Sequence, residues 1–139
     1  TVAQEDIAAH CQAYEDKIKA CGGLDLQILG IGRTGHIGFN EPGSDDTTRT
    51  RQVHLDDLTK TDAAPAFGGF ENVPCTAITM GVATIMGAKK VRLMAWGEKK
   101  ASIVNKAING PITADVAASY LQKHPDAKYF LDKPAAAEL

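Results

Sequence analysis

The first twenty-one positions carry apolar residues at the spacing of an α-helix. Steps of four, three, four and three residues separate these positions: Ile7, Cys11, Tyr14, Ile18 and Cys21. Such spacing places them on one face of a helix. We predict an amphipathic helix over Gln4–Ala20 with one buried stripe, ended by the glycine pair that follows Cys21.

A strand and then a long irregular segment are expected next. Leu24, Leu26 and Ile28 alternate with polar residues up to Gly30, which is typical of a strand. Residues 30–69 are rich in glycine, Asp and Thr and show little periodicity. They predict a long loop region, and long loops inside compact domains are usually functional or disordered.

Order returns in the second half, where short apolar runs alternate between strand and helix patterns. The predicted strands are Thr76–Met80, Val91–Trp96 and Lys128–Leu131, and the predicted helices are Gly81–Met86, Glu98–Ile108 and Ala114–Lys123. This alternation indicates an α/β fold with a mainly parallel sheet flanked by helices.

The net charge and the hydropathy pattern argue against nucleic acids and membranes as partners. The 139 residues carry 15 Lys and Arg against 17 Asp and Glu, a formal net charge of −2. Nucleic-acid-binding proteins need basic patches, so we expect no such partner. No window of about 18 apolar residues and no signal-peptide pattern is present, and we expect a cytoplasmic protein that does not bind membranes.

The cysteines predict neither a disulfide framework nor a metal site. Three of them, Cys11, Cys21 and Cys75, occur without any Cys-x-x-Cys spacing. Zinc sites and small disulfide-rich domains use closer and more numerous cysteines. We expect buried free thiols and no metal.

Residues 30–35 match the glycine pattern of dinucleotide-binding folds, Gly-x-Gly-x-x-Gly. In those folds the pattern opens a helix whose N-terminus meets the pyrophosphate. Here Gly38, Pro42 and Gly43 follow within a few residues and leave no room for such a helix. We therefore expect no nicotinamide cofactor, and no other cofactor. The glycines favour close approach of backbone N–H groups to an anion or a sugar, or form a merely structural turn.

His36 and Glu41 bring acid–base chemistry into the same loop. A histidine suits proton transfer near neutral pH, and a nearby carboxylate orients its ring and raises its basicity. Both follow a glycine turn at a strand end, where α/β proteins commonly bind ligands. We interpret His36 and Glu41 as candidate catalytic residues.

The segment Gly30–Ser44 resembles the signature loop of glucosamine-6-phosphate deaminases, also called isomerases. Later segments resemble that family in the same order: Asn72–Pro74, Ala77–Ile85, Trp96–Ala101 and Tyr120–Pro125. The resemblance covers essentially the whole chain, 1–139, and corresponds to the C-terminal portion of such a domain. It implies a three-layer, Rossmann-like sheet of the deaminase/isomerase type, here incomplete because the N-terminal half is absent.

The resemblance also implies a reaction and a set of site residues. Full-length members convert glucosamine 6-phosphate to fructose 6-phosphate and ammonia, and are commonly homo-oligomers. His36 matches the residue that opens the sugar ring, and Glu41 matches the carboxylate that orients it. Lys100 matches the lysine that binds the substrate phosphate, and Gly30 a glycine of the substrate site. The family's central proton-shuttling aspartate belongs to the missing front half, so we expect the chain alone to be inactive.

Several positions depart from the family pattern. Thr34 stands where members usually have an aspartate, and no arginine is present near 63–65, where a second phosphate-binding arginine is expected. Ser44 and Arg51 match part of an allosteric site, whereas Val53 replaces a lysine there. Two alternatives therefore stay open: a non-catalytic or regulatory sugar-phosphate-binding relative, and a 6-phosphogluconolactonase-like hydrolase.

Overall fold

A three-stranded parallel sheet organises the larger part of the molecule. The computed structural model describes residues 6–139. Its main sheet has the order β1 (Gln27–Leu29), β4 (Val91–Ala95), β5 (Ala127–Leu131), and all three strands are parallel. The expected α/β fold with a mainly parallel sheet is confirmed, although β1 is shorter than the predicted strand.

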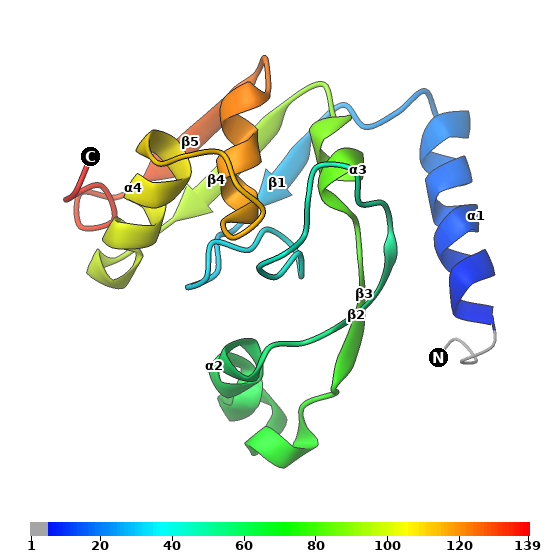
Figure 1. Ribbon diagram of the computed structural model, residues 1–139, viewed down its shortest axis with the longest axis horizontal. Helices are drawn as coiled ribbons and strands as arrows, with labels where there is room; N and C mark the ends of the chain where they lie inside the picture. Colours follow the sequence, from blue (N-terminus) through cyan, green and yellow to red (C-terminus); the bar gives the residue numbers. More distant parts are fainter. Residues whose placement is uncertain (1–5) are drawn as a thin grey trace.

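Helices cover one face of this sheet (Figure 1). They are α3 (Val82–Met86), α4 (Ala101–Asn109) and the 3₁₀ segment η4 (Ala117–Lys123), with the short 3₁₀ turn η3 (Glu98–Lys100) ahead of α4. Successive side chains of a strand point to opposite faces, so residues such as Leu29 and Leu93 point into the core between the sheet and the helices.

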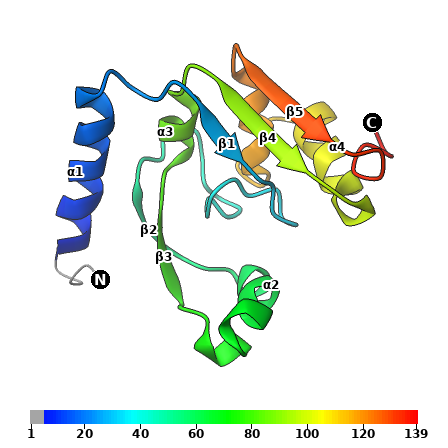
Figure 2. The same ribbon diagram turned by 180° about the vertical axis from the view of Figure 1, so that it is seen from behind.

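The opposite face carries no helix within the described residues (Figure 2). Ile28 and Phe130 lie there and remain 57% and 50% exposed. Leu26, which the alternation grouped with Ile28, is also half exposed. A single helical layer therefore accompanies the sheet in 6–139, and the second layer of the expected three-layer arrangement is not seen there.

A long hairpin with a helix at its far end replaces much of the predicted loop over 30–69. Strand β2 (Arg51–His54) pairs antiparallel with β3 (Thr76–Thr79), and α2 (Asp57–Phe67) and the 3₁₀ turn η2 (Phe70–Asn72) connect them. The loop prediction was wrong for β2 because its pairing partner lies more than twenty residues later. It was wrong for α2 because Pro65 lies inside the helix, where proline is unfavourable.

Helix α1 (Ile7–Ala20) confirms the first predicted helix, and Gln4 and Glu5 lie outside the described residues. Its stripe is less buried than expected, since only Cys11 is buried and Tyr14 is 41% exposed. The helix stands beside the hairpin rather than on the sheet (Figure 1). A polar contact holds it there: Glu15 accepts hydrogen bonds from the hydroxyls of Thr50 and Thr84.

Two smaller expectations need correction. The segment predicted as a helix over Ala114–Lys123 is 3₁₀ over Ala117–Lys123, since Ala118 N–H donates outward to the Gly35 carbonyl at 2.9 Å. The thiols of Cys21 and Cys75 are exposed, not buried.

Among the described residues, no helix is long and apolar enough to cross a membrane.

Candidate functional site

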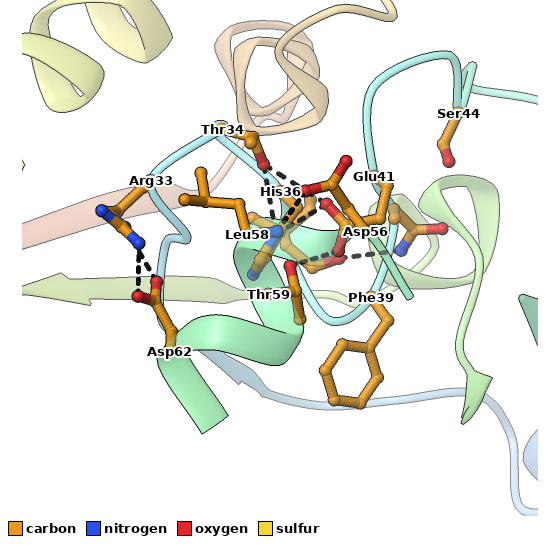
Figure 3. Close-up of polar contacts among 12 residues, drawn as sticks. Arg33, Thr34, His36, Phe39, Glu41, Ser44, Asp56, Leu58, Thr59 and Asp62 are labelled. Atoms are coloured by element: carbon orange, nitrogen blue, oxygen red, sulfur yellow. Dashed lines mark hydrogen bonds and ion pairs between the residues drawn. The ribbon is translucent and has the colours of Figure 1, made fainter. Parts of the chain in front are cut away.

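His36 and Glu41 form a close pair in the loop that follows β1. His36 Nδ1 lies 3.0 Å from Glu41 Oε2, and the two side chains are only 17% and 14% exposed. The glycine turn makes room for the ring, because any side chain at Gly32 would overlap the imidazole. His36 and Glu41, which lie five residues apart in the sequence, are thus in direct contact (Figure 3).

Two threonines complete the surroundings of the carboxylate. Thr59, from α2, donates its hydroxyl to Glu41 Oε1 at 2.5 Å. Thr34 donates to Glu41 Oε2 at 3.3 Å and lies 3.2 Å from His36 Nδ1. Both carboxylate oxygens are occupied, so Glu41 is held in one orientation (Figure 3). Thr34 joins this network as a neutral hydroxyl and adds no charge to it.

This network selects one form of the neutral histidine. Because Glu41 accepts a hydrogen bond from Nδ1, that nitrogen carries the proton. Within the described residues, Nε2 of His36 has no hydrogen-bond partner, and it is the nitrogen left to exchange a proton with a ligand. The arrangement can perform general acid–base chemistry.

A buried asparagine anchors the loop between these two residues. Asn40 is fully buried, and its Nδ2 donates to the carbonyls of Ile37 and Met80, both at 2.8 Å. Its Oδ1 accepts from Arg51 Nη1 at 2.9 Å. The backbone that precedes Glu41 is therefore tied to β2 and to the residue that follows β3.

Arg51 and Ser44, matched from the sequence to an allosteric site, lie together. Arg51 Nη2 donates to Ser44 Oγ at 2.9 Å. Burial lowers the pKa of Arg51, and the charge of Asp45 works in the opposite direction. In this structure, Arg51 donates hydrogen bonds to other side chains of the chain, Asn40 and Ser44. An allosteric role for the pair stays a prediction.

Lys100, in the 3₁₀ turn η3 that follows β4, reaches the same loop. Its Nζ donates to the Ile31 carbonyl at 2.7 Å. Burial lowers the pKa of Lys100, the charge of Arg33 adds to this, and the charge of Asp62 opposes it. Gly30 is exposed, and a side chain there would meet nothing within 4 Å. The space beside Gly30 agrees with a ligand site, and its role stays a prediction.

Sequence reasoning missed the contributions of α2. Thr59 and Asp62 come from this helix, and Asp62 forms an ion pair with Arg33 of the glycine turn at 2.5 Å. Asp56 before the helix and Gly68 after it are typical cap residues, and they were the available signals. At positions 63–65 the helix carries no cation.

The cluster around His36 and Glu41 is separate from the cavity beside α1. A cavity of about 810 Å³ between α1 and the hairpin is lined partly by Arg51 but not by His36, Glu41 or Lys100. In the part of the chain that the structure describes, no three His, Cys, Asp or Glu side chains come together as metal ligands.

Comparison with known proteins decides the family. Residues 1–129 match the family model described as glucosamine-6-phosphate isomerases/6-phosphogluconolactonase. The chain belongs to this family. A glucosamine-6-phosphate deaminase of Arthrobacter sp. (strain FB24) is 51% identical over 134 residues, which are 96% of this chain and 52% of the relative.

Solved structures of both kinds of family member resemble the chain, a deaminase at higher identity than a lactonase. The structure of a monomeric glucosamine-6-phosphate deaminase matches with a TM-score of 0.94 and 41% identity, covering 99% of this chain and 56% of that one. A 6-phosphogluconolactonase from Trypanosoma cruzi shares the fold, with a TM-score of 0.72 at 24% identity over 100% of this chain and 54% of that one. The chain thus spans about half the length of each of these relatives.

Proposed function

We propose that this chain forms the acid–base and phosphate-binding half of a glucosamine-6-phosphate deaminase. The reaction is the conversion of glucosamine 6-phosphate to fructose 6-phosphate and ammonia, a step of amino-sugar catabolism in the cytoplasm. The observation that carries the proposal is the His36–Glu41 pair, with 3.0 Å between Nδ1 and Oε2 in a loop at the end of β1. Its support is the high identity to deaminases.

The pair suits the first step of this reaction. Opening the pyranose ring breaks the C1–O5 bond, removes a proton from the C1 hydroxyl and delivers one to O5. With Nδ1–H donated to Glu41, His36 Nε2 can take up and return that proton. The carboxylate stabilises the imidazolium that forms in between.

The later steps need groups that we assign to different parts of the protein. We propose that Lys100 binds the substrate phosphate beside Gly30, as an ammonium that can pair with an anion. Moving the C2 proton to C1 needs a base, and we assign it to the half of the domain that precedes this chain in the family. A homo-oligomeric full-length protein stays an expectation, and one deaminase of known structure is described as monomeric.

The two alternatives differ from this proposal in measurable ways. A regulatory relative would bind the sugar phosphate without releasing ammonia, and the neutral Thr34 in the site is the observation that favours it. A lactonase would hydrolyse 6-phosphogluconolactone. The similarity to lactonases shows the fold alone, because the identity to the Trypanosoma cruzi structure is 24%.

The test joins this chain to the N-terminal half of the Arthrobacter deaminase, which is 51% identical over the shared part. A coupled assay then follows ammonia release from glucosamine 6-phosphate. We expect turnover by the chimera and negligible turnover by the 139-residue chain alone. His36→Ala in the chimera should lower kcat by about 10²- to 10⁴-fold, the usual contribution of a general acid–base group.

His10→Ala supplies the matched control, since His10 is an exposed histidine on α1. We expect it to keep the turnover of the chimera. Equal turnover in the His36→Ala chimera would remove His36 from the mechanism. A chimera that binds glucosamine 6-phosphate without releasing ammonia would support the regulatory alternative instead.

A further inference from the structure

Arg33 of the glycine turn and Asp62 of α2 form a two-point ion pair. Arg33 Nε donates to Asp62 Oδ2 at 2.9 Å, and Nη2 donates to Oδ1 at 2.5 Å (Figure 3). The side chains are 42% and 51% exposed. Exposed pairs of this kind contribute little to stability, about 0–1 kcal/mol, so an exchange of partners is inexpensive.

A second cation, Lys100, is held at the same glycine turn. Lys100 Nζ is bound to the carbonyl of Ile31, two residues before Arg33. The charges of Arg33 and Asp62 both act on Lys100: Arg33 lowers its pKa, and Asp62 raises it. Two cations and one carboxylate therefore share a small, partly exposed region next to the His36 loop.

The geometry of Arg33 suits an anion with several oxygens. The guanidinium presents parallel N–H donors that fit either a carboxylate or a phosphate. A phosphate carries more negative charge than the Asp62 carboxylate and has oxygens to spare for Lys100. A phosphate that contacts both gains from two cations, whereas among the described residues Asp62 makes a direct ion pair with Arg33 alone.

We propose that Arg33 is a second cationic ligand for the substrate phosphate, and that the Asp62 carboxylate occupies its guanidinium when no ligand is bound. This inference rests on the proposed function for its ligand, a phosphate monoester. Asp62 is thus a built-in competitor, and phosphate binding releases it from Arg33. The sugar would then lie between the bound phosphate and the imidazole of His36.

The test measures phosphate binding by the 139-residue chain. Inorganic phosphate and glucosamine 6-phosphate are titrated while ¹H–¹⁵N spectra follow the Arg33 Nε–H signal. Loss of a charge-assisted hydrogen bond costs about 1.5–3 kcal/mol, so Arg33→Gln should weaken binding by about 10- to 100-fold. Asp62→Asn should strengthen binding several-fold, and should have no effect once Arg33 is replaced.

Two further variants make the outcome decisive. Asp25→Asn removes the carboxylate of another exposed ion pair, with Lys89 at 2.6 Å, and should leave phosphate binding unchanged. Arg33→Lys keeps the charge without the two-point geometry, and an affinity between those of wild type and Arg33→Gln is expected. If Arg33→Gln were to disturb the fold, Arg33→Lys and the Nε–H signal of the wild type would still decide the question.

Each contrary result has a separate meaning. Wild-type affinity in Arg33→Gln, or an Arg33 Nε–H signal that does not move while Lys100→Gln weakens binding, overturns the role of Arg33 and leaves the proposed function standing. Absence of phosphate binding by the wild-type chain also overturns this inference. The proposed function itself is decided by ammonia release in the chimera, which is an independent measurement.

Discussion

Replacement of Asn40 by alanine should destabilise the fold more than almost any other polar substitution. The side chain is fully buried and makes two amide-to-carbonyl hydrogen bonds, to Ile37 and Met80. It also accepts one hydrogen bond from the charged Arg51. A neutral hydrogen bond contributes about 1 kcal/mol and one to a charged group about 1.5–3 kcal/mol, so Asn40→Ala should cost about 3–5 kcal/mol.

Urea denaturation followed by circular dichroism measures this loss of unfolding free energy. A domain of ordinary stability has about 5–15 kcal/mol, so the shift in midpoint will be large. Asn72→Ala is the control, because Asn72 is exposed and the hydrogen bond from its side chain to the Gly68 carbonyl is 3.4 Å long. We expect this control to change stability by less than about 0.5 kcal/mol.

A second substitution separates the parts of the Asn40 network. Asn40→Asp keeps the shape and an acceptor for Arg51 but replaces the two N–H donors, so at least about 2 kcal/mol of the loss should remain. If Asn40→Ala were as stable as Asn72→Ala, the buried network would not hold the loop, and our account of how Glu41 is positioned would fail.

Two more predictions concern protonation. With both rings neutral, long-range ¹H–¹⁵N spectra should show His36 protonated at Nδ1, which faces Glu41, and His124 protonated at Nε2, which faces the Ala88 carbonyl at 2.7 Å. The same tautomer in both rings would contradict the hydrogen-bond assignment. The Tyr129 hydroxyl is buried without a hydrogen-bond partner among the described residues, and burial raises its pKa. Tyr129→Phe should therefore raise the unfolding free energy by about 1 kcal/mol. The difference should widen above about pH 10, where the unfolded tyrosine ionises and the folded one does not; urea midpoints at neutral and alkaline pH measure it, and a variant less stable than wild type at both would contradict it.

Local patterns predicted much of the main sheet and its helical layer. The strands β3, β4 and β5 and the helices α1, α3 and α4 lie close to the predicted ranges. Each of them combines a recognisable apolar period with glycine or proline at an end, and such signals act within a few residues. The same approach failed for β2, which has four residues and pairs only with β3, far along the chain.

In the candidate site, too, contacts within one loop could be predicted from the sequence, and contacts between distant segments could not. His36, Thr34 and Glu41 belong to one loop, so their proximity follows from their spacing in the sequence. Thr59 contacts Glu41 across 18 residues, and Asp62 contacts Arg33 across 29. No periodicity records contacts at such separations, because they depend on where the hairpin places α2.

The sequence alone therefore determined the order of the main-sheet strands and their helices, the family resemblance and the histidine–carboxylate loop. All of these depend on residues that are neighbours along the chain. Only the tertiary structure decided that α2 holds Glu41 through Thr59, that Asn40 accepts a hydrogen bond from Arg51, and that Lys100 binds the Ile31 carbonyl in the glycine turn. These contacts form when strand pairing and core burial bring distant segments together, and the energy of that packing is not encoded in any short window of the sequence.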